Sequence, residues 1–165
     1  RRQLSMTMAA QIAQAERLDQ PISCLMLDVD HFKRVNDEYG HDAGDAVLRE
    51  VGQTLRAFTC EDGPAFRYGG EEFVLLLPGF GPEQALACGE AVRAAIAALR
   101  ITSEGRAVGA ITASIGVASA PAHCPADRIV QAADAALLRA KSAGRDCVVS
   151  AICRGDAAAI SGHLA

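Results

Sequence analysis

The amino-acid sequence predicts an α+β fold, in which a central mixed, largely antiparallel sheet is flanked by helices. Apolar residues recur at helical spacing in four stretches, and short apolar runs typical of strands lie between them. Two of these runs follow each other directly across a glycine pair, which predicts a hairpin. Adjacent hairpin strands argue against a purely parallel, doubly wound sheet.

The first part of the chain predicts a helix, a strand and a second helix. An amphipathic helix is expected over residues 2–18, where Leu4, Met8 and Ile12 share one face, and Pro21 ends this region. The apolar run Ile22–Val29 predicts a buried strand. A turn is expected next, followed by a helix marked by apolar residues; the turn residues are Asn36, Asp37, Gly40 and Gly44, and the apolar residues are Val47, Leu48, Val51, Leu55 and Phe58.

The second part predicts a hairpin and then two helices that alternate with two strands. The expected ranges are 65–68 and 73–77 for the hairpin strands, 85–99 for a helix, 111–118 for a strand, 129–140 for a helix that Gly144 ends, and 147–152 for the last strand. We expect one domain over residues 1–152 and a poorly ordered tail over residues 153–165, because the tail is rich in alanine and glycine.

Composition narrows the classes of partner. The formal net charge of −4 argues against a nucleic-acid binder, although a phosphorylated small molecule needs only a local positive cluster or a metal ion. No apolar run approaches the roughly 20 residues that span a bilayer, so no direct membrane contact is expected. The six cysteines are scattered without a C-x-x-C pair, which indicates a reducing, cytoplasmic location rather than a zinc site or a disulfide framework.

Carboxylates follow both a predicted strand and the predicted hairpin turn. Asp28 and Asp30 lie where the apolar strand ends, and Glu71 and Glu72 follow Gly69-Gly70. If the two strands are neighbours, the acids converge and require a cation, and hard oxygen ligands suit Mg²⁺. Glycine suits such a turn because it adopts positive φ and lets a ligand approach the backbone. Alternatively, the two aspartates only cap the next helix and the glycine pair is only a turn.

Four motifs occur in order along the chain. They are L-D-V-D-H-F-K-R-V-N-D-E-Y-G-H-D-A-G-D over residues 27–45, R-Y-G-G-E-E-F over 67–73, S-I-G-V-A over 114–118 and A-D-A-A-L-L-R-A-K-S-A-G-R over 133–145. Together they resemble the GGDEF family of diguanylate cyclases, and the similarity runs from residue 1 to about residue 149. Each motif alone is a far weaker signal than the ordered set.

The resemblance implies a fold similar to the palm of polymerases and class III nucleotide cyclases, and an activity. Two GTP molecules would be condensed into cyclic di-GMP with release of pyrophosphate, a phosphoryl transfer that depends on positioning and electrostatics. The family match implies that Asp28, the Val29 carbonyl and Glu71 bind Mg²⁺ or Mn²⁺. Glu71 would also accept the proton of the attacking 3′-hydroxyl, with Glu72 as a required neighbour and Lys33 stabilising charge on the phosphates.

The resemblance also implies a set of GTP contacts. These are Asn36 and Asp45 for guanine, His41 as a further substrate contact, the Phe32–Lys33 amides, Gly69 and Gly70 at the signature turn, and Lys141 and Arg145 for the terminal phosphates. An ionised Asp45 accepts from guanine N1–H and the exocyclic amine, whereas adenine would leave it unpaired. Alternatively, Lys33, Arg34, Lys141 and Arg145 form a solvated face, Asn36-Asp37 and Gly44-Asp45 are plain turns, and His31 and His41 are polar surface residues.

Two departures from the family pattern affect the expected domain start and regulation. The usual opening segment D-x-L-T-G-L-x-N-R-R is represented only by Arg1-Arg2, so we expect a truncated domain start. The inhibitory R-x-x-D is also absent, because Cys60 and Gly63 stand at its arginine and aspartate positions. Product feedback through a bidentate arginine is therefore expected to be lost.

The family pattern implies a homodimer for catalysis, because one site holds only one of the two GTP molecules. It also implies an upstream sensory domain in the full-length protein, which could be anchored in a membrane. The main alternative is a catalytically silent GTP-binding sensor module, and a weaker one is a purely structural dimerisation module. The intact G-G-E-E-F signature favours the enzyme.

Overall fold

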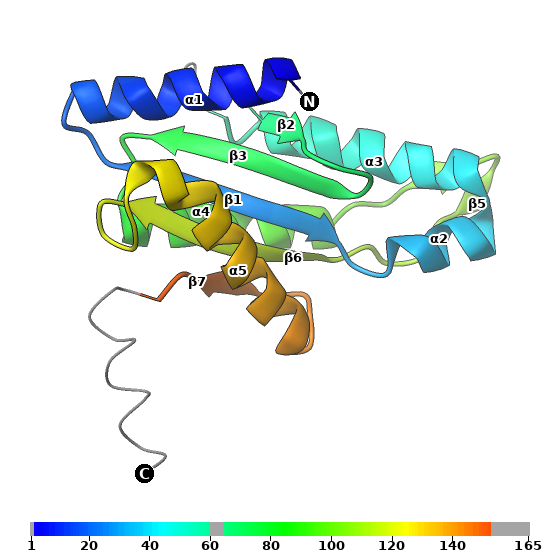
Figure 1. Ribbon diagram of the computed structural model, residues 1–165. Helices are drawn as coiled ribbons and strands as arrows, with labels where there is room; N and C mark the ends of the chain where they lie inside the picture. The colour runs from blue at the N-terminus through cyan, green and yellow to red at the C-terminus, as the bar shows by residue number, and fades with distance from the viewer. Residues whose placement is uncertain (1, 60–64, 153–165) are drawn as a thin grey trace, which may run out of the picture.

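The computed structural model describes residues 2–59 and 65–152, which form a five-stranded sheet with helices on both faces (Figure 1). The elements are α1 Arg2–Arg17, β1 Ile22–Val29, α2 Phe32–Tyr39, α3 His41–Arg56, β2 Ala65–Arg67, β3 Glu72–Pro78, α4 Pro82–Ala97, β4 Thr102–Ser103, β5 Arg106–Ala107, β6 Ala113–Ala120, the 3₁₀ turn η1 Ala126–Arg128, α5 Ile129–Ser142 and β7 Val148–Ser150.

The sheet order is β2-β3-β1-β6-β7. The pairings β2–β3, β3–β1 and β1–β6 are antiparallel, while β6–β7 is parallel because α5 carries the chain back between them. This confirms the mixed, largely antiparallel α+β fold. The central strand β1 ends with Asp28 between Glu72 of β3 and Ser114 of β6, so its last residues lie in the middle of one sheet edge.

Alternate residues of β1 face two different apolar layers. Leu25 and Leu27 pack with α2, α3 and α4, whereas Cys24 and Met26 pack with α1 and α5. Every residue of β1 is buried, which explains why its sequence is apolar except at Ser23 and Asp28. Burial raises the pKa of the Cys24 thiol to about 12, so this cysteine behaves as the small apolar residue that the sequence predicts.

The segment after β1 differs from the sequence-based expectation. Asn36 and Asp37 lie inside the helix α2, and Gly44 lies inside α3, where a turn was predicted. The helix forms because Phe32 and Val35, three residues apart, are both buried against the sheet. The short β4–β5 ribbon was also not predicted, and α3 ends before Phe58.

Other elements agree with the prediction to within a few residues. Gly116 allows α5 to lie directly on β6, because a Cβ at this position would strike the α5 backbone at Ala133 and Leu137.

The expected tail and the Cys60–Gly63 segment lie outside the described residues. Within the described part of the chain, no helix is both long and apolar enough to cross a lipid bilayer.

Candidate active site

The end of β1 carries the first two proposed metal ligands. Asp28 is only 7% exposed, and the Val29 N–H donates to the Glu71 carbonyl oxygen at 3.2 Å. This backbone bond places Glu71 beside the end of β1. The structure therefore brings Asp28, Val29 and Glu71 together, as the sequence predicts.

Lys141 joins this group from α5. Its Nζ lies 2.7 Å from Asp28 Oδ2, and both side chains are mostly buried. The lysine was expected at the phosphates of a nucleotide, and here it neutralises the carboxylate that would hold a cation. It is therefore a member of the site and not part of a solvated face.

Glu71 lies in an environment that disfavours its charge. Burial, the neighbouring Asp28 and, to a smaller extent, Glu72 raise the pKa of its carboxyl, while Lys141 acts in the opposite direction. A cation between Asp28 and Glu71 would relieve this repulsion. The unrelieved charge and the pure oxygen donor set therefore fit Mg²⁺ or Mn²⁺.

The carboxylates alone do not form a ready-made metal cage. Within residues 2–59 and 65–152, no group of three or more His, Cys, Asp or Glu side chains could hold a metal ion. Mg²⁺ is commonly held by one or two carboxylates, with water and substrate phosphates completing its shell. The site thus matches a metal that arrives with a nucleotide.

Asp30 has a different role from Asp28, although the sequence analysis grouped them. Its carboxylate accepts hydrogen bonds from Thr112 Oγ1 at 2.8 Å, Ser114 Oγ at 2.6 Å and the Asp146 N–H at 3.0 Å. It is 5% exposed, so these donors satisfy a buried charge. The capping alternative is also wrong, since His31 occupies the N-cap of α2 without a side-chain cap bond.

The hairpin turn between β2 and β3 is held by Arg67. Its Nε donates to the Gly70 carbonyl oxygen at 3.0 Å and its Nη2 to the same oxygen at 2.7 Å, with a longer Nε contact to Gly69 O. Neither glycine has the positive φ that the sequence analysis expected. A Cβ at Gly69 would lie 2.6 Å from Glu72 Oε2, the flexible end of a side chain that can move aside.

The α2–α3 pair positions the proposed guanine contacts. A Cβ at Gly44 would collide with Asn36 Oδ1, so the amide of Asn36 lies against the α3 backbone immediately before Asp45. His41 and Asp45 are one helical turn apart on α3, and both are exposed. Phe32 and Lys33 form the first turn of α2, where backbone N–H groups have no intrahelical partner. The alternative that Asn36-Asp37 and Gly44-Asp45 are plain turns is therefore wrong.

Arg145 lies in the turn after α5. It has a φ of 67° and an exposed side chain, and its N–H donates to the Ala140 carbonyl at 3.1 Å. The next residue, Asp146, is anchored at its N–H by Asp30 and at its carboxylate by Arg93. Arg145 is thereby held at the same edge of the sheet as Asp28.

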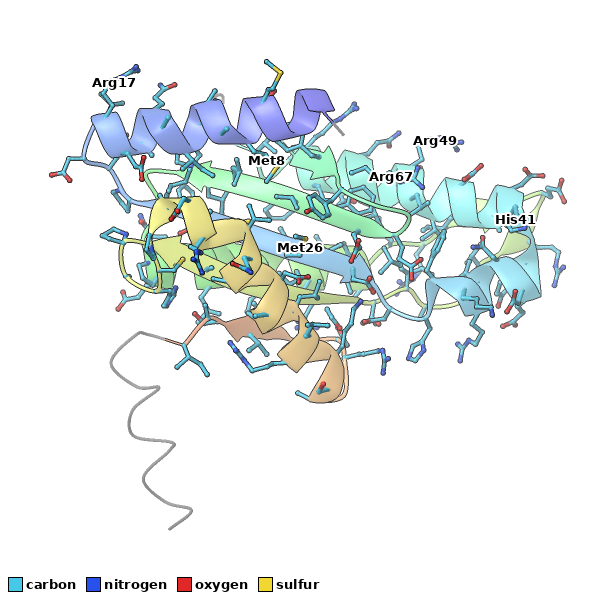
Figure 2. All side chains as sticks on the ribbon, in the orientation of Figure 1. Met8, Arg17, Met26, His41, Arg49 and Arg67 are labelled. Carbon is cyan, nitrogen blue, oxygen red and sulfur yellow. The ribbon has the colours of Figure 1, made fainter. Side chains whose placement is uncertain are left out.

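Sequence reasoning missed two arginines next to Asp45. Arg49 and Arg67, with Leu48, line a hollow of ≈ 330 Å³ beside this aspartate, and both arginines are labelled in Figure 2. The missed signal was the spacing, since Arg49 is one helical turn beyond Asp45 and two beyond His41.

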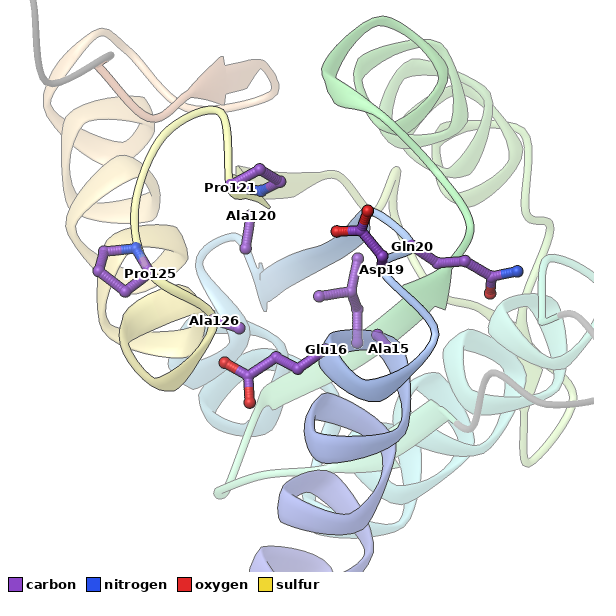
Figure 3. Close-up of a pocket in the computed structure, with 9 residues that line it drawn as sticks. Ala15, Glu16, Asp19, Gln20, Ala120, Pro121, Pro125 and Ala126 are labelled. Carbon is purple, nitrogen blue, oxygen red and sulfur yellow. The ribbon is translucent and has the colours of Figure 1, made fainter.

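Another cavity lies at the opposite end of β1. It has a volume of ≈ 340 Å³, and Figure 3 shows Glu16 and Asp19 from the α1 end facing Pro121 and Pro125. Ile22, which begins β1, also lines it, so it is roughly 20 Å from Asp28. Its lining contains two acids and no basic residue, and it therefore does not suit a triphosphate.

The chain is similar to known proteins over most of its length. A family model described as "Diguanylate cyclase, GGDEF domain" matches residues 1–147. Diguanylate cyclase DosC of Escherichia coli K12 is 36% identical over 146 residues, which cover 88% of this chain and 32% of that protein. The chain thus spans about a third of the length of this relative.

Solved structures show the same fold. The GGDEF domain of DgcB from Caulobacter crescentus, in complex with c-di-GMP, superposes with a TM-score of 0.84 at 31% identity, covering 91% of this chain and 89% of that one. The active GGEEF domain of a diguanylate cyclase from Vibrio cholerae gives a TM-score of 0.81 at 34% identity, covering 92% and 96%.

Proposed function

Because the chain belongs to the GGDEF domain family of diguanylate cyclases, we propose that it condenses two molecules of GTP into cyclic di-GMP with release of pyrophosphate. The observation that carries this proposal is the meeting of Asp28, Glu71 and Lys141 at one edge of the sheet. That edge lies beside the α2–α3 pair, which carries groups able to bind a guanine base. In this proposal the GGDEF domain comprises residues 1–152.

The carboxylates of Asp28 and Glu71, with the Val29 carbonyl, would hold Mg²⁺ or Mn²⁺. When bound, such a cation neutralises developing charge on the phosphoryl oxygens and lowers the pKa of the attacking hydroxyl. Glu71 would accept the proton of the attacking 3′-hydroxyl, as a general base positioned beside the end of β1. The Glu72 carbonyl accepts hydrogen bonds from the Tyr68 and Gly69 N–H groups and closes the turn that precedes Glu71 and Glu72 in β3.

Cationic side chains and backbone N–H groups would bind the triphosphate. The Lys141 ammonium pairs with Asp28 in the absence of ligand and would bind the phosphates when that carboxylate is occupied by a metal. Lys33 and the first N–H groups of α2 offer positive charge and donors at a helix N-terminus, where anions bind well. Arg145 adds a guanidinium at the same edge.

The guanine base would be held against α3, between Asn36 of α2 and the β2–β3 hairpin. Asp45 accepts from N1–H and the exocyclic amine, and the Asn36 amide beside it adds a second polar contact. His41 lies one turn earlier on α3 and has an exposed side chain. Adenine presents an acceptor at N1 and would leave the carboxylate unpaired, which favours GTP over ATP.

Catalysis would use two copies of the domain, since each site holds one GTP and the product contains two nucleotides. We therefore infer a homodimer that forms at least during turnover. The relatives are about three times longer than the matched segment, and we infer an upstream sensory domain that brings two copies together. We infer a cytoplasmic location, because GTP is the proposed substrate.

The decisive test is the product formed from GTP and Mg²⁺ by the purified chain. We expect cyclic di-GMP, and we expect Glu71→Gln to reduce its rate of formation by at least about a hundredfold. Glu83→Gln on the exposed face of α4 serves as the control and should leave the rate unchanged. GTP binding without product in the wild-type chain would identify a silent sensor module and contradict the proposed activity.

A further inference from the structure

The hollow beside Asp45 holds more recognition chemistry than the two guanine contacts described above. It lies between α3 and the β2–β3 hairpin and is lined by Asp45, Leu48, Arg49 and Arg67. Figure 2 shows the two arginines near one another on this side of the molecule. A purine base that contacts Asp45 would therefore lie within a polar hollow with two guanidinium groups at its wall.

The two arginines differ in what they already bind. Arg67 uses Nε and Nη2 to hold the Gly70 carbonyl, so its fork is committed to the turn. For Arg49, the described residues show no side-chain hydrogen bond and no ion pair, although Asp45 is four residues before it on the same helix. Opposite charges at this spacing commonly pair. Here both groups remain available to a ligand in the hollow.

Guanine offers two polar edges that match these two groups. Its N1–H and exocyclic amine are donors, which a carboxylate complements. Its O6 and N7 are acceptors, which the fork of a guanidinium complements in a bidentate manner. Leu48 supplies an apolar wall for the face of the ring. Adenine carries a donor at its 6-position and cannot make the second pair.

We propose that Arg49 is a specificity-determining residue, whose guanidinium binds O6 and N7 of the guanine while Asp45 and Asn36 bind the adjoining edge. The inference rests on the proposed function, since it requires that GTP occupies this hollow. It adds a contact that makes base selection depend on both edges of the purine.

The test compares nucleotides that cannot react because they lack the 3′-hydroxyl. Calorimetry with ddGTP and 7-deaza-ddGTP measures the contribution of N7, and ddITP measures that of the exocyclic amine. We expect the wild-type chain to bind 7-deaza-ddGTP about tenfold more weakly than ddGTP. In Arg49→Met this difference should shrink to less than about twofold, because the partner of N7 is gone. The weaker binding of ddITP should persist, because it depends on Asp45.

Two further variants separate the fork from its charge. Arg49→Lys keeps the charge without the planar fork, and should lose the discrimination at N7. Arg56→Met changes another exposed arginine of α3, outside the hollow, and should behave as the wild type. Equal binding of ddGTP and 7-deaza-ddGTP by the wild-type chain would overturn the inference. An equal loss for both nucleotides in Arg49→Met would overturn it as well, because it would indicate a phosphate contact.

The outcome is distinguishable from failure of the proposed function. If the wild-type chain makes cyclic di-GMP from GTP but shows no discrimination at N7, only the role of Arg49 is overturned. If the wild-type chain makes no product and binds no ddGTP, both the proposed function and this inference are wrong.

Discussion

The polar groups at the two ends of β1 differ in how completely they are paired. At the beginning of the strand, Ser23 donates to the Phe80 carbonyl at 2.7 Å and contacts Ser119 Oγ at 2.7 Å. The Ser119 N–H in turn donates to His123 Nδ1 at 2.9 Å. These groups are buried and neutral, and they partner one another. This network joins β1 to β6 and to the loop that follows β6.

At the other end the polar groups carry charge, and the negative charges of the acids are only partly neutralised. Asp28 has one cationic partner, while Glu71 has acidic neighbours that raise its pKa. Polar groups that satisfy one another stabilise the fold, whereas groups left beside like charges are arranged for a ligand. A position at the charged end of β1 does not by itself make an acid available to a ligand. Asp30 lies at this end, and yet its carboxylate accepts hydrogen bonds from three donors.

The largest effect on stability is expected at Asp30. Asp30→Ala leaves two hydroxyl groups and the Asp146 N–H without their acceptor, and should lower the free energy of unfolding by about 3 kcal/mol. Asp28→Ala should cost less than about 1 kcal/mol while abolishing activity, since it also relieves the repulsion with Glu71. Urea unfolding of both variants measures the contrast. Equal losses of stability would remove the distinction between the two aspartates.

A smaller effect is expected at Lys141. Lys141→Met removes the cation that opposes the raised pKa of Glu71, so the cluster becomes more repulsive near neutral pH. We expect a loss of about 1 kcal/mol at pH near 7 and a smaller loss at pH near 5, where carboxylates accept protons more readily. Added Mg²⁺ should restore the melting temperature of this variant more than that of the wild type.

Lys33→Met is the matched control for that experiment. The substitution removes the same positive charge, but at an exposed position. A pH-independent loss in Lys141→Met would show that its aliphatic packing, and not its charge, stabilises the site.

The smallest effect is expected from His123, at the neutral end. Burial lowers the pKa of this histidine below 6.5, so the folded state favours the neutral ring. Its contribution to stability is therefore complete above the unfolded pKa and declines as the pH falls below it. His123→Asn should reduce the decline in melting temperature between about pH 7.5 and pH 5.5. His31→Asn, at an exposed position, should leave the decline unchanged, and the same result for both variants would exclude His123 as its source.

Much of the fold could be predicted because its signals are local. The buried strand Ile22–Val29 is apolar except at Ser23 and Asp28, and the hairpin is marked by Gly69-Gly70. The helix α2 was not predicted because Asn36 and Asp37 are residue types common in turns. Only the packing against the sheet shows that Phe32 and Val35 lie on one buried face of a helix. Tertiary contacts thus overrode the local preference.

The site was predicted from its motifs but not from its geometry. The sequence pairs Asp28 with Asp30 by proximity, and only the positions of Thr112, Ser114 and Asp146 show that Asp30 is structural. Similarly, the ion pair between Lys141 and Asp28 joins residues 113 positions apart (141 − 28), and no local pattern reveals it. Arg49 could have been found from its helical spacing to Asp45.

The hydrogen bond from the Asp146 N–H to Asp30 has a consequence for the synthesis of the protein. The two residues are 116 positions apart, so the buried Asp30 lacks one donor until almost the whole domain has left the ribosome. Lys141 likewise emerges late, and until then Asp28 has no counter-ion. The proposed nucleotide site is therefore completed by α5, and a nascent chain without α5 lacks the Lys141 partner of Asp28. A ribosome-stalled chain that ends before α5 should not bind GTP, whereas one long enough to expose residue 152 should.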